Sequence, residues 1–224
     1  MNREYSYRYP HPAVTTDIVV FTISDGALKL LLIKRGQAPH KGAWALPGGF
    51  LEPDEGLSEC AHRELREETG LENIYLEQLY TFGKPGRDPR ERVVSVAYFA
   101  LVPTMGTTPV AASDAVVTGW HAMDKLPPLA FDHSEIVRMA LKRLLSKLNY
   151  SSIAFQFLPE AFTLSEAQKV YEIVRNEKLD KRNFRKQITN LGLIEETGDQ
   201  RRNGNHRPAR LYRAVCRSKV QMIK

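Results

Sequence analysis

The sequence has few cysteines and no long apolar segment. Cys60 and Cys216 are the only two cysteines among 224 residues, and their separation matches neither a paired-ligand metal site nor a disulfide framework. No run of about 18 apolar residues occurs, which argues against a membrane-spanning helix. The N-terminal stretch MNREYSYRYPHPAV lacks the apolar core and cleavage site of a secretory signal. We therefore expect reduced thiols, no membrane partner and a cytoplasmic location.

The first two thirds of the chain carry no excess of basic residues. Residues 1–150 carry 17 Lys and Arg against 18 Asp and Glu, a net charge of −1, whereas residues 151–224 carry 15 against 8, a net charge of +7. A strong helical pattern ends near residue 148. A new one begins at Thr163, which has capping-box spacing with Glu166. Two domains are therefore expected, at residues 1–150 and 151–224.

Strands and helices alternate along the first domain. Residues 14–23 and 28–35 are predicted to be strands joined by a turn, and residues 92–102 and 115–123 to be later strands rich in β-branched and aromatic side chains. Residues 133–148 place their apolar side chains on one helical stripe. The expected fold class is an α/β sandwich.

An acidic helix carries the strongest functional signal. If residues 57–68 form a helix, its apolar face continues as the carboxylates of Glu64, Glu67 and Glu68. Three carboxylates that face partly inward repel one another and resist desolvation unless a cation neutralises them. Mg²⁺ suits such a site, because it favours a few carboxylates together with waters and substrate phosphates. The alternative is a solvated acidic helix end balanced by neighbouring arginines.

The residues around this helix resemble the Nudix box. The chain has Gly49, then five residues, Glu55, then seven residues, and then RELREETGL from Arg63 to Leu71, which fills every defining position. The resemblance implies a Nudix α/β/α sandwich with a mixed sheet that hydrolyses, or at least binds, nucleoside diphosphates linked to another group. Pro85, fifteen residues after Gly70, has a placement that resembles the ADP-ribose pyrophosphatases of this family.

The Nudix resemblance also implies roles for particular residues. Glu64, Glu67 and Glu68 would hold Mg²⁺ or Mn²⁺ with help from Glu55, and Arg63 would orient the carboxylates through ion pairs. Metal ions on the pyrophosphate oxygens would neutralise developing charge and polarise a water, from which one carboxylate takes the proton. The separate roles of the three glutamates in catalysis stay open. Gly48 and Gly49 let the backbone bend tightly and approach a phosphate or support the metal.

Candidate ligand residues also lie before and after the box. Arg35 ends a predicted strand, where it either reaches a phosphate or is merely solvated. Arg87 and Arg90 belong to a Gly/Pro-rich loop, which we interpret as a substrate clamp rather than a polar hairpin. Phe131 either stacks on a base or packs in the core. Asp132 precedes a helix, and we expect its side chain to cap that helix.

The last third carries the signals of a DNA-binding domain. A helix near residues 163–176, a second helix near 181–191, and short strands at 193–198 and 209–215 around a basic loop follow the order of a winged helix-turn-helix. The second helix would read bases through Arg182, Asn183 and Lys186, and the loop would be the wing. The residues expected to contact DNA are Lys181, Arg182, Asn183, Arg185, Lys186, Arg201, Arg202, His206 and Arg207.

Two basic clusters and a net charge of +7 favour double-stranded DNA as a partner over the alternative of a solvated face. Contacts to phosphates would supply most of the affinity. One domain of this size contacts only a short stretch of DNA. We therefore expect a homodimer on a two-fold operator, with half-sites about 34 Å apart or a multiple of that distance.

A Nudix domain followed by a winged helix with KRNFRK and RPARLY resembles the NrtR-type transcriptional regulators of NAD metabolism. The resemblance implies a repressor whose Nudix domain binds ADP-ribose or a related nucleotide. Regulators of this type often have a damaged Nudix box, but here no box position is lost, so hydrolysis stays open. The alternatives are a Mg²⁺-dependent ADP-ribose pyrophosphatase whose C-terminal domain serves targeting or dimerisation, and a sugar-sensing regulator.

Overall fold

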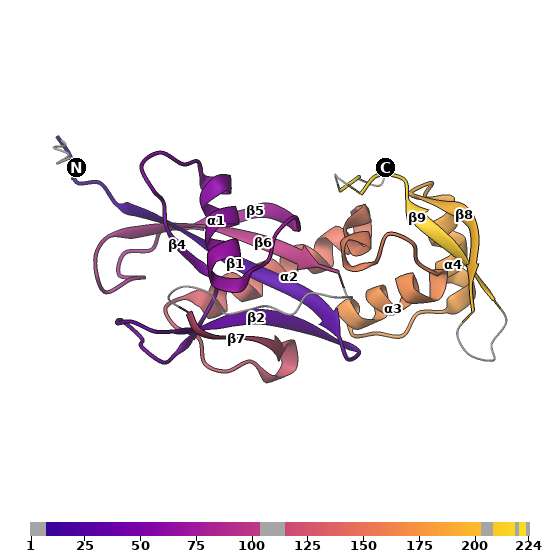
Figure 1. The fold of residues 1–224 in the computed structure, drawn as a ribbon, viewed down its shortest axis with the longest axis horizontal. Coiled ribbons are helices and arrows are strands. Elements are labelled where there is room, and N and C mark those ends of the chain that lie inside the picture. Colours follow the sequence, from indigo (N-terminus) through magenta and orange to yellow (C-terminus); the bar gives the residue numbers. More distant parts are fainter. Residues whose placement is uncertain (1–7, 104–114, 203–207, 218–219, 223–224) are drawn as a thin grey trace.

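The computed structural model describes residues 8–103, 115–202, 208–217 and 220–222. Figure 1 shows a sheet between two helices, with a smaller helical unit and a hairpin at the opposite end of the molecule from the N-terminus. None of the described helices is both long and apolar enough to cross a membrane. The elements in chain order are β1 (Ala13–Ser24), β2 (Ala27–Arg35), β3 (Trp44–Ala45), β4 (Gly48–Phe50), α1 (Leu57–Thr69), β5 (Tyr75–Phe82), β6 (Val93–Val102), β7 (Ala115–Ala122), η1 (Met123–Lys125), α2 (His133–Tyr150), η2 (Ser152–Phe157), α3 (Leu164–Arg175), α4 (Lys181–Asn190), β8 (Ile194–Arg201) and β9 (Ala209–Ala214).

A seven-stranded mixed sheet forms the centre of the first part. The order β3-β2-β1-β6-β5 runs across it, while β4 pairs with β1 and β7 pairs with β2. Strands β1 and β6 are parallel, with Thr15 opposite Ser95 and Asp17 opposite Ala97, and the other pairs are antiparallel. This arrangement confirms the predicted mixed sheet.

Apolar side chains of β1 are buried on both sides of the sheet. Ile18 and Val20 pack with Leu65 in the cluster on the α1 side, whereas Val19 and Phe21 belong to the larger cluster on the α2 side. Because successive side chains of a strand point to opposite faces, a continuous apolar strand is suited to a sheet covered on both sides. The result is the predicted α/β/α sandwich.

The second part is a winged helix, with α3 and α4 followed by the β8-β9 hairpin. The capping box at the start of α3 is confirmed, since the amide of Glu166 donates to Thr163 Oγ1 at 3.1 Å and the amide of Thr163 donates to Glu166 Oε2 at 2.7 Å. Asp180 caps α4 by accepting from the amide of Asn183 at 2.8 Å. Phe184 and Ile188 form the buried stripe of α4.

The segment η2 joins the two parts and is buried along its whole length. It contacts α2, β6 and α3, and its Ile153 and Phe155 belong to a hydrophobic cluster that runs from the sheet into the winged helix. The C-terminal segment covers it, because the amide of Ser152 donates to the carbonyl of Gln221 at 2.9 Å. The expected boundary after residue 150 therefore coincides with the end of α2, although the hydrophobic core continues through it.

Several short or polar strands were missing from the sequence prediction. Strands β3 and β4 have two and three residues, too few for a periodic pattern. Strand β5 lies at an edge of the sheet and mixes buried Leu79 and Phe82 with exposed Tyr80, so the alternation is interrupted by a bulge.

Candidate functional site

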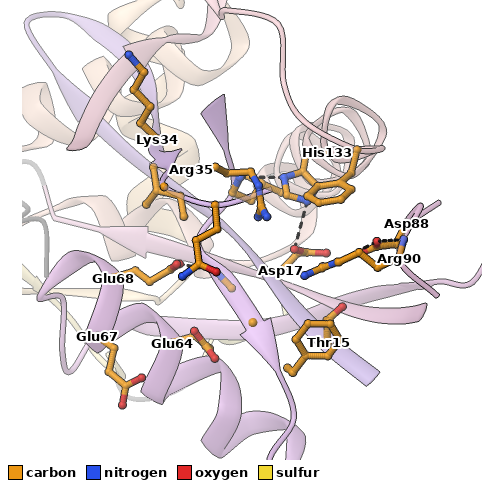
Figure 2. A pocket seen from close by; sticks show the side chains of 18 of the residues that line it. Thr15, Asp17, Lys34, Arg35, Glu64, Glu67, Glu68, Asp88, Arg90 and His133 are labelled. Carbon is orange, nitrogen blue, oxygen red and sulfur yellow. Dashed lines mark hydrogen bonds and ion pairs between the residues drawn. The ribbon is translucent and has the colours of Figure 1, made fainter. Parts of the chain in front are cut away.

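A cavity of about 570 Å³ opens between the sheet, the acidic helix α1 and the start of α2 (Figure 2). This volume lies in the range of about 300–1,000 Å³ that is usual for small-molecule sites. We refer to it as the ligand cavity. Its walls bring together the following residues predicted from sequence: Arg35, Gly48, Gly49, Glu64, Glu67, Glu68, Arg87, Arg90 and Phe131.

The acidic wall of the ligand cavity is formed by α1. The helix begins after Gly56 and ends at Gly70, whose positive φ of 70° gives the left-handed conformation of a C-terminal stop. Its buried stripe includes Leu65 and Thr69, which the sequence analysis did not place on that face. In Figure 2, Glu64, Glu67 and Glu68 project from the helix on one side of the cavity.

Arg63 is the centre of an ion-pair cluster on α1. Its guanidinium lies 2.6 Å from Glu55 Oε1, 2.7 Å from Glu64 Oε1 and 3.2 Å from Glu67 Oε2. The two hydrogen bonds from Arg63 lower the pKa of Glu55 to about 2. Glu55 contacts Arg63 and does not line the ligand cavity. One guanidinium therefore contacts three carboxylates, and the orienting role of Arg63 stays a prediction.

The two glycines of β4 provide close approaches at the acidic wall. A Cβ atom on Gly49 would lie 2.2 Å from Glu64 Oε1, and one on Gly48 would lie 2.0 Å from the carbonyl oxygen of Thr16. The amide of Gly48 donates to Glu68 Oε2 at 2.8 Å. Any larger residue at position 49 would displace the Glu64 carboxylate, so Gly49 is required for the observed arrangement.

Burial raises the pKa values of two glutamates of the acidic wall. It raises the pKa of Glu68 to about 8, and the nearby Glu64 carboxylate adds to this effect, while the Gly48 amide opposes it. Burial also raises the pKa of Glu64, although Arg63 pairs with it. Both carboxyl groups are therefore harder to ionise than free ones, and a bound cation would favour their ionised forms.

The opposite wall is basic and aromatic. The guanidinium carbon of Arg35 lies 4.9 Å from the centre of the Phe131 ring, and that of Arg90 lies 5.8 Å from the same centre. Arg35 also donates to the carbonyl of Pro39 at 2.9 Å, and Asp88 holds Arg90 at 2.6 Å. Burial, and then the charge of Arg90, lower the pKa of Arg35. Arg35 is therefore part of the cavity wall, and two guanidinium groups around one ring favour an anionic ligand.

A buried network that reaches the cavity wall through Arg87 corrects the predicted role of Asp132. Asp132 occupies the N-cap position of α2, but its side chain makes no capping hydrogen bond. It pairs instead with Arg87, whose guanidinium donates to it at 2.7 and 2.9 Å and reaches Asp17 at 3.2 Å. The Arg87 side chain is only 5% exposed. The pairing with a buried guanidinium explains why the carboxylate does not turn back to the helix amides.

Asp17 and His133 are two further residues of the cavity wall that were not predicted from the sequence. Asp17 accepts a hydrogen bond from Ser95 at 2.5 Å, and His133 Nε2 lies 3.4 Å from it. His133 Nδ1 accepts from the amide of Leu46 at 2.9 Å, so the ring proton is on Nε2, facing Asp17. Burial alone would raise the pKa of Asp17, but His133, Ser95 and Arg87 outweigh it and leave the pKa below its ordinary value. The sequence signal for Asp17 was a single carboxylate within the otherwise apolar pattern of the first predicted strand.

Helix α4, which we call the reader helix because the sequence predicts that it reads bases, turns its basic side chains to solvent. The exposed set is Lys181, Arg182, Asn183, Arg185 and Lys186. Arg185 also lies 3.4 Å from Ser165 Oγ of α3. Phe184 and Ile188 lie on the buried side of the helix, and contact between the exposed face and DNA stays a prediction.

The predicted wing residues differ in their surroundings. Arg201 donates to Glu166 Oε1 at 2.9 Å and to the carbonyl of Ala161 at 2.8 Å, so its guanidinium is engaged within the winged helix. Arg202 is exposed. His206 and Arg207 lie outside the described residues.

Comparison with known proteins places both parts of the chain. Residues 12–140 match the NUDIX domain, and residues 154–214 match the NrtR DNA-binding winged helix domain. The ADPR responsive transcriptional repressor NtrR of Acinetobacter baylyi is 40% identical over 92% of this chain and 83% of its own length. The chain belongs to the NrtR family. Shewanella oneidensis NrtR, solved in complex with a 27mer DNA, is 36% identical with a TM-score of 0.78, covering 90% of this chain and 93% of that one.

A second structure of the NrtR family bears on the ligand cavity. The NUDIX domain of Shewanella oneidensis NrtR, solved in complex with ADP ribose, is 36% identical with a TM-score of 0.57 and covers 61% of this chain and 90% of that one. The stretch of this NrtR-family chain that matches the NUDIX domain, residues 12–140, includes both walls of the ligand cavity.

Nudix hydrolases generally use divalent metal ions. The acidic wall suits such an ion in its chemistry, because it offers hard carboxylate oxygens that are only partly neutralised by Arg63. Among the described residues of this NrtR-family chain, no three His, Cys, Asp or Glu side chains converge closely enough to hold an ion by themselves. An ion bound here would therefore need water or ligand phosphate oxygens as well, which is the usual situation for Mg²⁺.

Proposed function

We propose that this chain is a transcriptional repressor whose ligand cavity binds ADP-ribose or a related nucleoside diphosphate derivative. The observation that carries the proposal is the division of the cavity into an acidic wall on α1 and a basic, aromatic wall at Arg35, Arg90 and Phe131. A diphosphate carries the negative charge that suits the two guanidinium groups. The repressor and the ADP-ribose complex among the relatives support this assignment.

Specific residues divide the work of binding in this proposal. Arg35 and Arg90 contact the phosphates, Phe131 packs against the base or a ribose, and Gly48 and Gly49 allow close approach of the ligand to β4. Glu64, Glu67 and Glu68 hold Mg²⁺ or Mn²⁺, while Glu55 supports them through Arg63. Arg87 lines the cavity, but Asp132 and Asp17 already hold its guanidinium, so it shapes the wall and does not clamp the phosphates.

The DNA side of the proposal rests on the exposed face of α4. Lys181, Arg185 and Lys186 contact phosphates, and Arg182 and Asn183 approach base edges. A homodimer on a two-fold operator matches the small reading surface of one winged helix. Sedimentation of the complex with a selected operator tests this stoichiometry, and one chain per duplex would refute the dimer.

The decisive experiment measures DNA and ligand together. A duplex selected from a random library by the full chain is labelled, and its affinity is measured by fluorescence anisotropy with and without ADP-ribose in a buffer containing Mg²⁺. We expect saturable binding that changes when ADP-ribose is added. Absence of selected DNA, or an affinity that neither ADP-ribose nor a panel of nucleotides changes, would refute the proposal. A response only to sugars would indicate the sugar-sensing alternative.

Hydrolysis of the ligand is a second candidate function, favoured by the intact set of Arg63, Glu64, Glu67 and Glu68. A divalent cation, when bound, would neutralise the diphosphate and polarise a water. The chain itself would orient the carboxylates through Arg63 and hold the diphosphate with Arg35 and Arg90. Mg²⁺-dependent release of AMP from ADP-ribose tests this function. Turnover of about 1 to 10³ s⁻¹ would indicate an enzyme, and binding without turnover would indicate a sensor.

A further inference from the structure

Helix α2 reaches from the ligand cavity to the reader helix. Its eighteen residues span about 27 Å at 1.5 Å per residue. His133, its first residue, lines the ligand cavity. Leu148 and Asn149, in its last turn, line a second cavity of about 580 Å³ together with Asp180 and Asn183 at the start of α4. One rigid element therefore has an end at each of the two sites.

The first end of α2 is tied to groups that a ligand would contact. Phe131 lies two residues before His133 and is shared by Arg35 and Arg90. An anionic ligand group that attracts these two guanidiniums competes with the Phe131 ring for them. The Arg87–Asp132 ion pair joins the loop that carries Arg87 to the start of α2. The contacts at the start of α2 therefore differ between the empty and the occupied cavity. Such a difference is the condition for a ligand to bias the position of α2.

Among the described residues, one side-chain hydrogen bond joins the other end of α2 to α3, beside apolar side chains that the two helices share in one hydrophobic cluster. Arg175, the last residue of α3, donates to Asn149 Oδ1 at 2.8 Å. The turn that follows is fixed to α3, because the amide of Leu179 donates to Glu172 at 3.0 Å and the carbonyl of Leu179 accepts from Gln168 at 2.9 Å. A shift of α3 is therefore passed to the start of α4.

The end of α2 and the start of α4 face each other across the second cavity. Asn149 lines it from α2, and Asn183 and Gln187 line it from α4. The apolar contact between Tyr171 and Phe184, with ring centres 5.4 Å apart, joins α3 to α4 and not α2 to α4. The path from α2 to the reader helix therefore runs through α3.

We propose that the Asn149–Arg175 hydrogen bond is a positioning contact that couples occupancy of the ligand cavity to the placement of α4 for DNA binding. The inference rests on the proposed function. It assigns Asn149 and Arg175 a role distinct from both ligand contact and DNA contact.

Asn149→Ala tests this role in the full chain. ADP-ribose affinity is measured by calorimetry, and affinity for the selected duplex is measured by anisotropy with and without ADP-ribose. We expect both separate affinities to stay within about 2-fold of wild type. The change in DNA affinity caused by ADP-ribose, about 5- to 150-fold for a typical coupling, should shrink by about 2- to 10-fold for one lost hydrogen bond.

Two further variants sharpen the result. Ser146→Ala, at an exposed position one turn earlier on α2, is the matched control and should retain the wild-type response. Arg175→Gln combined with Asn149→Ala should lose no more coupling than Asn149→Ala alone, because both changes remove the same contact.

The outcomes separate this inference from the function on which it rests. A wild-type chain whose DNA affinity is insensitive to ADP-ribose overturns the proposed function and the inference with it. A normal wild-type response that persists in Asn149→Ala overturns the inference alone. A loss of either separate affinity in Asn149→Ala also overturns it, since the contact would then support one site.

Discussion

Arg87→Ala is expected to destabilise the Nudix part of the chain by about 3–5 kcal/mol. The Arg87 side chain is 5% exposed, and it pairs with Asp17 at 3.2 Å and with Asp132 at 2.7 Å. Removing it leaves two carboxylates without their shared cation, and breaking a buried ion pair on one side typically costs about this much. The loss would be a large fraction of a typical total stability of about 5–15 kcal/mol.

Urea denaturation followed by tryptophan fluorescence provides the assay. Both tryptophans, Trp44 and Trp120, belong to the Nudix part of the chain, so the signal reports unfolding of the region that contains Arg87. Arg92→Ala is the matched control, because Arg92 makes only a weak contact, at 3.4 Å, with the carbonyl of Val93. A loss below about 1 kcal/mol for Arg87→Ala would refute the view that the buried pair is tightly coupled.

The pH dependence of stability gives an independent check on the same network. The folded pKa of Asp17 lies below its ordinary value of 3.8, so the ionised form stabilises the native state. This contribution is complete above the unfolded pKa and is lost as the pH falls below about 4 toward the folded pKa. Asp17→Asn should therefore flatten the acid side of the stability profile, and an unchanged profile would contradict this assignment.

Four further changes test the acidic wall and the DNA-binding surface. Gly49→Ala should displace Glu64, since the new Cβ would lie 2.2 Å from its carboxylate, and it should weaken Mg²⁺ binding by about 10- to 100-fold. Gly83→Ala is the control, because a Cβ there would have no contact closer than 3.8 Å. Equal Mg²⁺ affinities of Gly49→Ala and wild type in calorimetry would refute the clash. Glu67→Gln should abolish Mg²⁺-dependent AMP release without changing the DNA affinity of the ligand-free chain, measured by anisotropy. Loss of both AMP release and DNA affinity would mean that the residue is structural. Lys186→Ala should reduce the slope of log affinity against log salt by about 0.9, and an unchanged slope would refute the phosphate contact. Arg201→Ala should weaken DNA binding while leaving that slope unchanged, because its guanidinium is bound to Glu166 and Ala161; a reduced slope would show a direct DNA contact.

Local patterns predicted most of the fold. The apolar run of β1, the stripe of α2 and the capping box of α3 are each determined by neighbours in the sequence, and all are present in the structure. Strand β5 was missed because its position at the sheet edge leaves polar and apolar residues mixed along it. Edge strands gain their structure from pairing with a neighbour, here β6, and such pairing leaves little trace in local periodicity.

The ligand cavity was predictable where its residues share one motif. Glu64, Glu67 and Glu68 lie on consecutive turns of one helix, so spacing alone placed them together. The Asp132 side chain illustrates the limit. The sequence offered it the helix amides that follow, but the fold brought Arg87, forty-five positions away, within 2.7 Å. A charge-assisted pair at a buried position is stronger than a capping bond, and no local pattern reports that such a partner is near.

The continuous core restricts how a ligand can influence DNA binding. Separating the winged helix from the Nudix part would expose Ile153, Phe155 and Phe157, all of which are essentially buried. Each such side chain contributes about 1.5–3 kcal/mol on burial, so exposing all three would cost at least about 4.5 kcal/mol. A ligand coupling of about 1–3 kcal/mol cannot supply that free energy. Any effect of the ligand on DNA affinity must therefore arise from small shifts of packed elements such as α2 and α3, with the two parts remaining in contact.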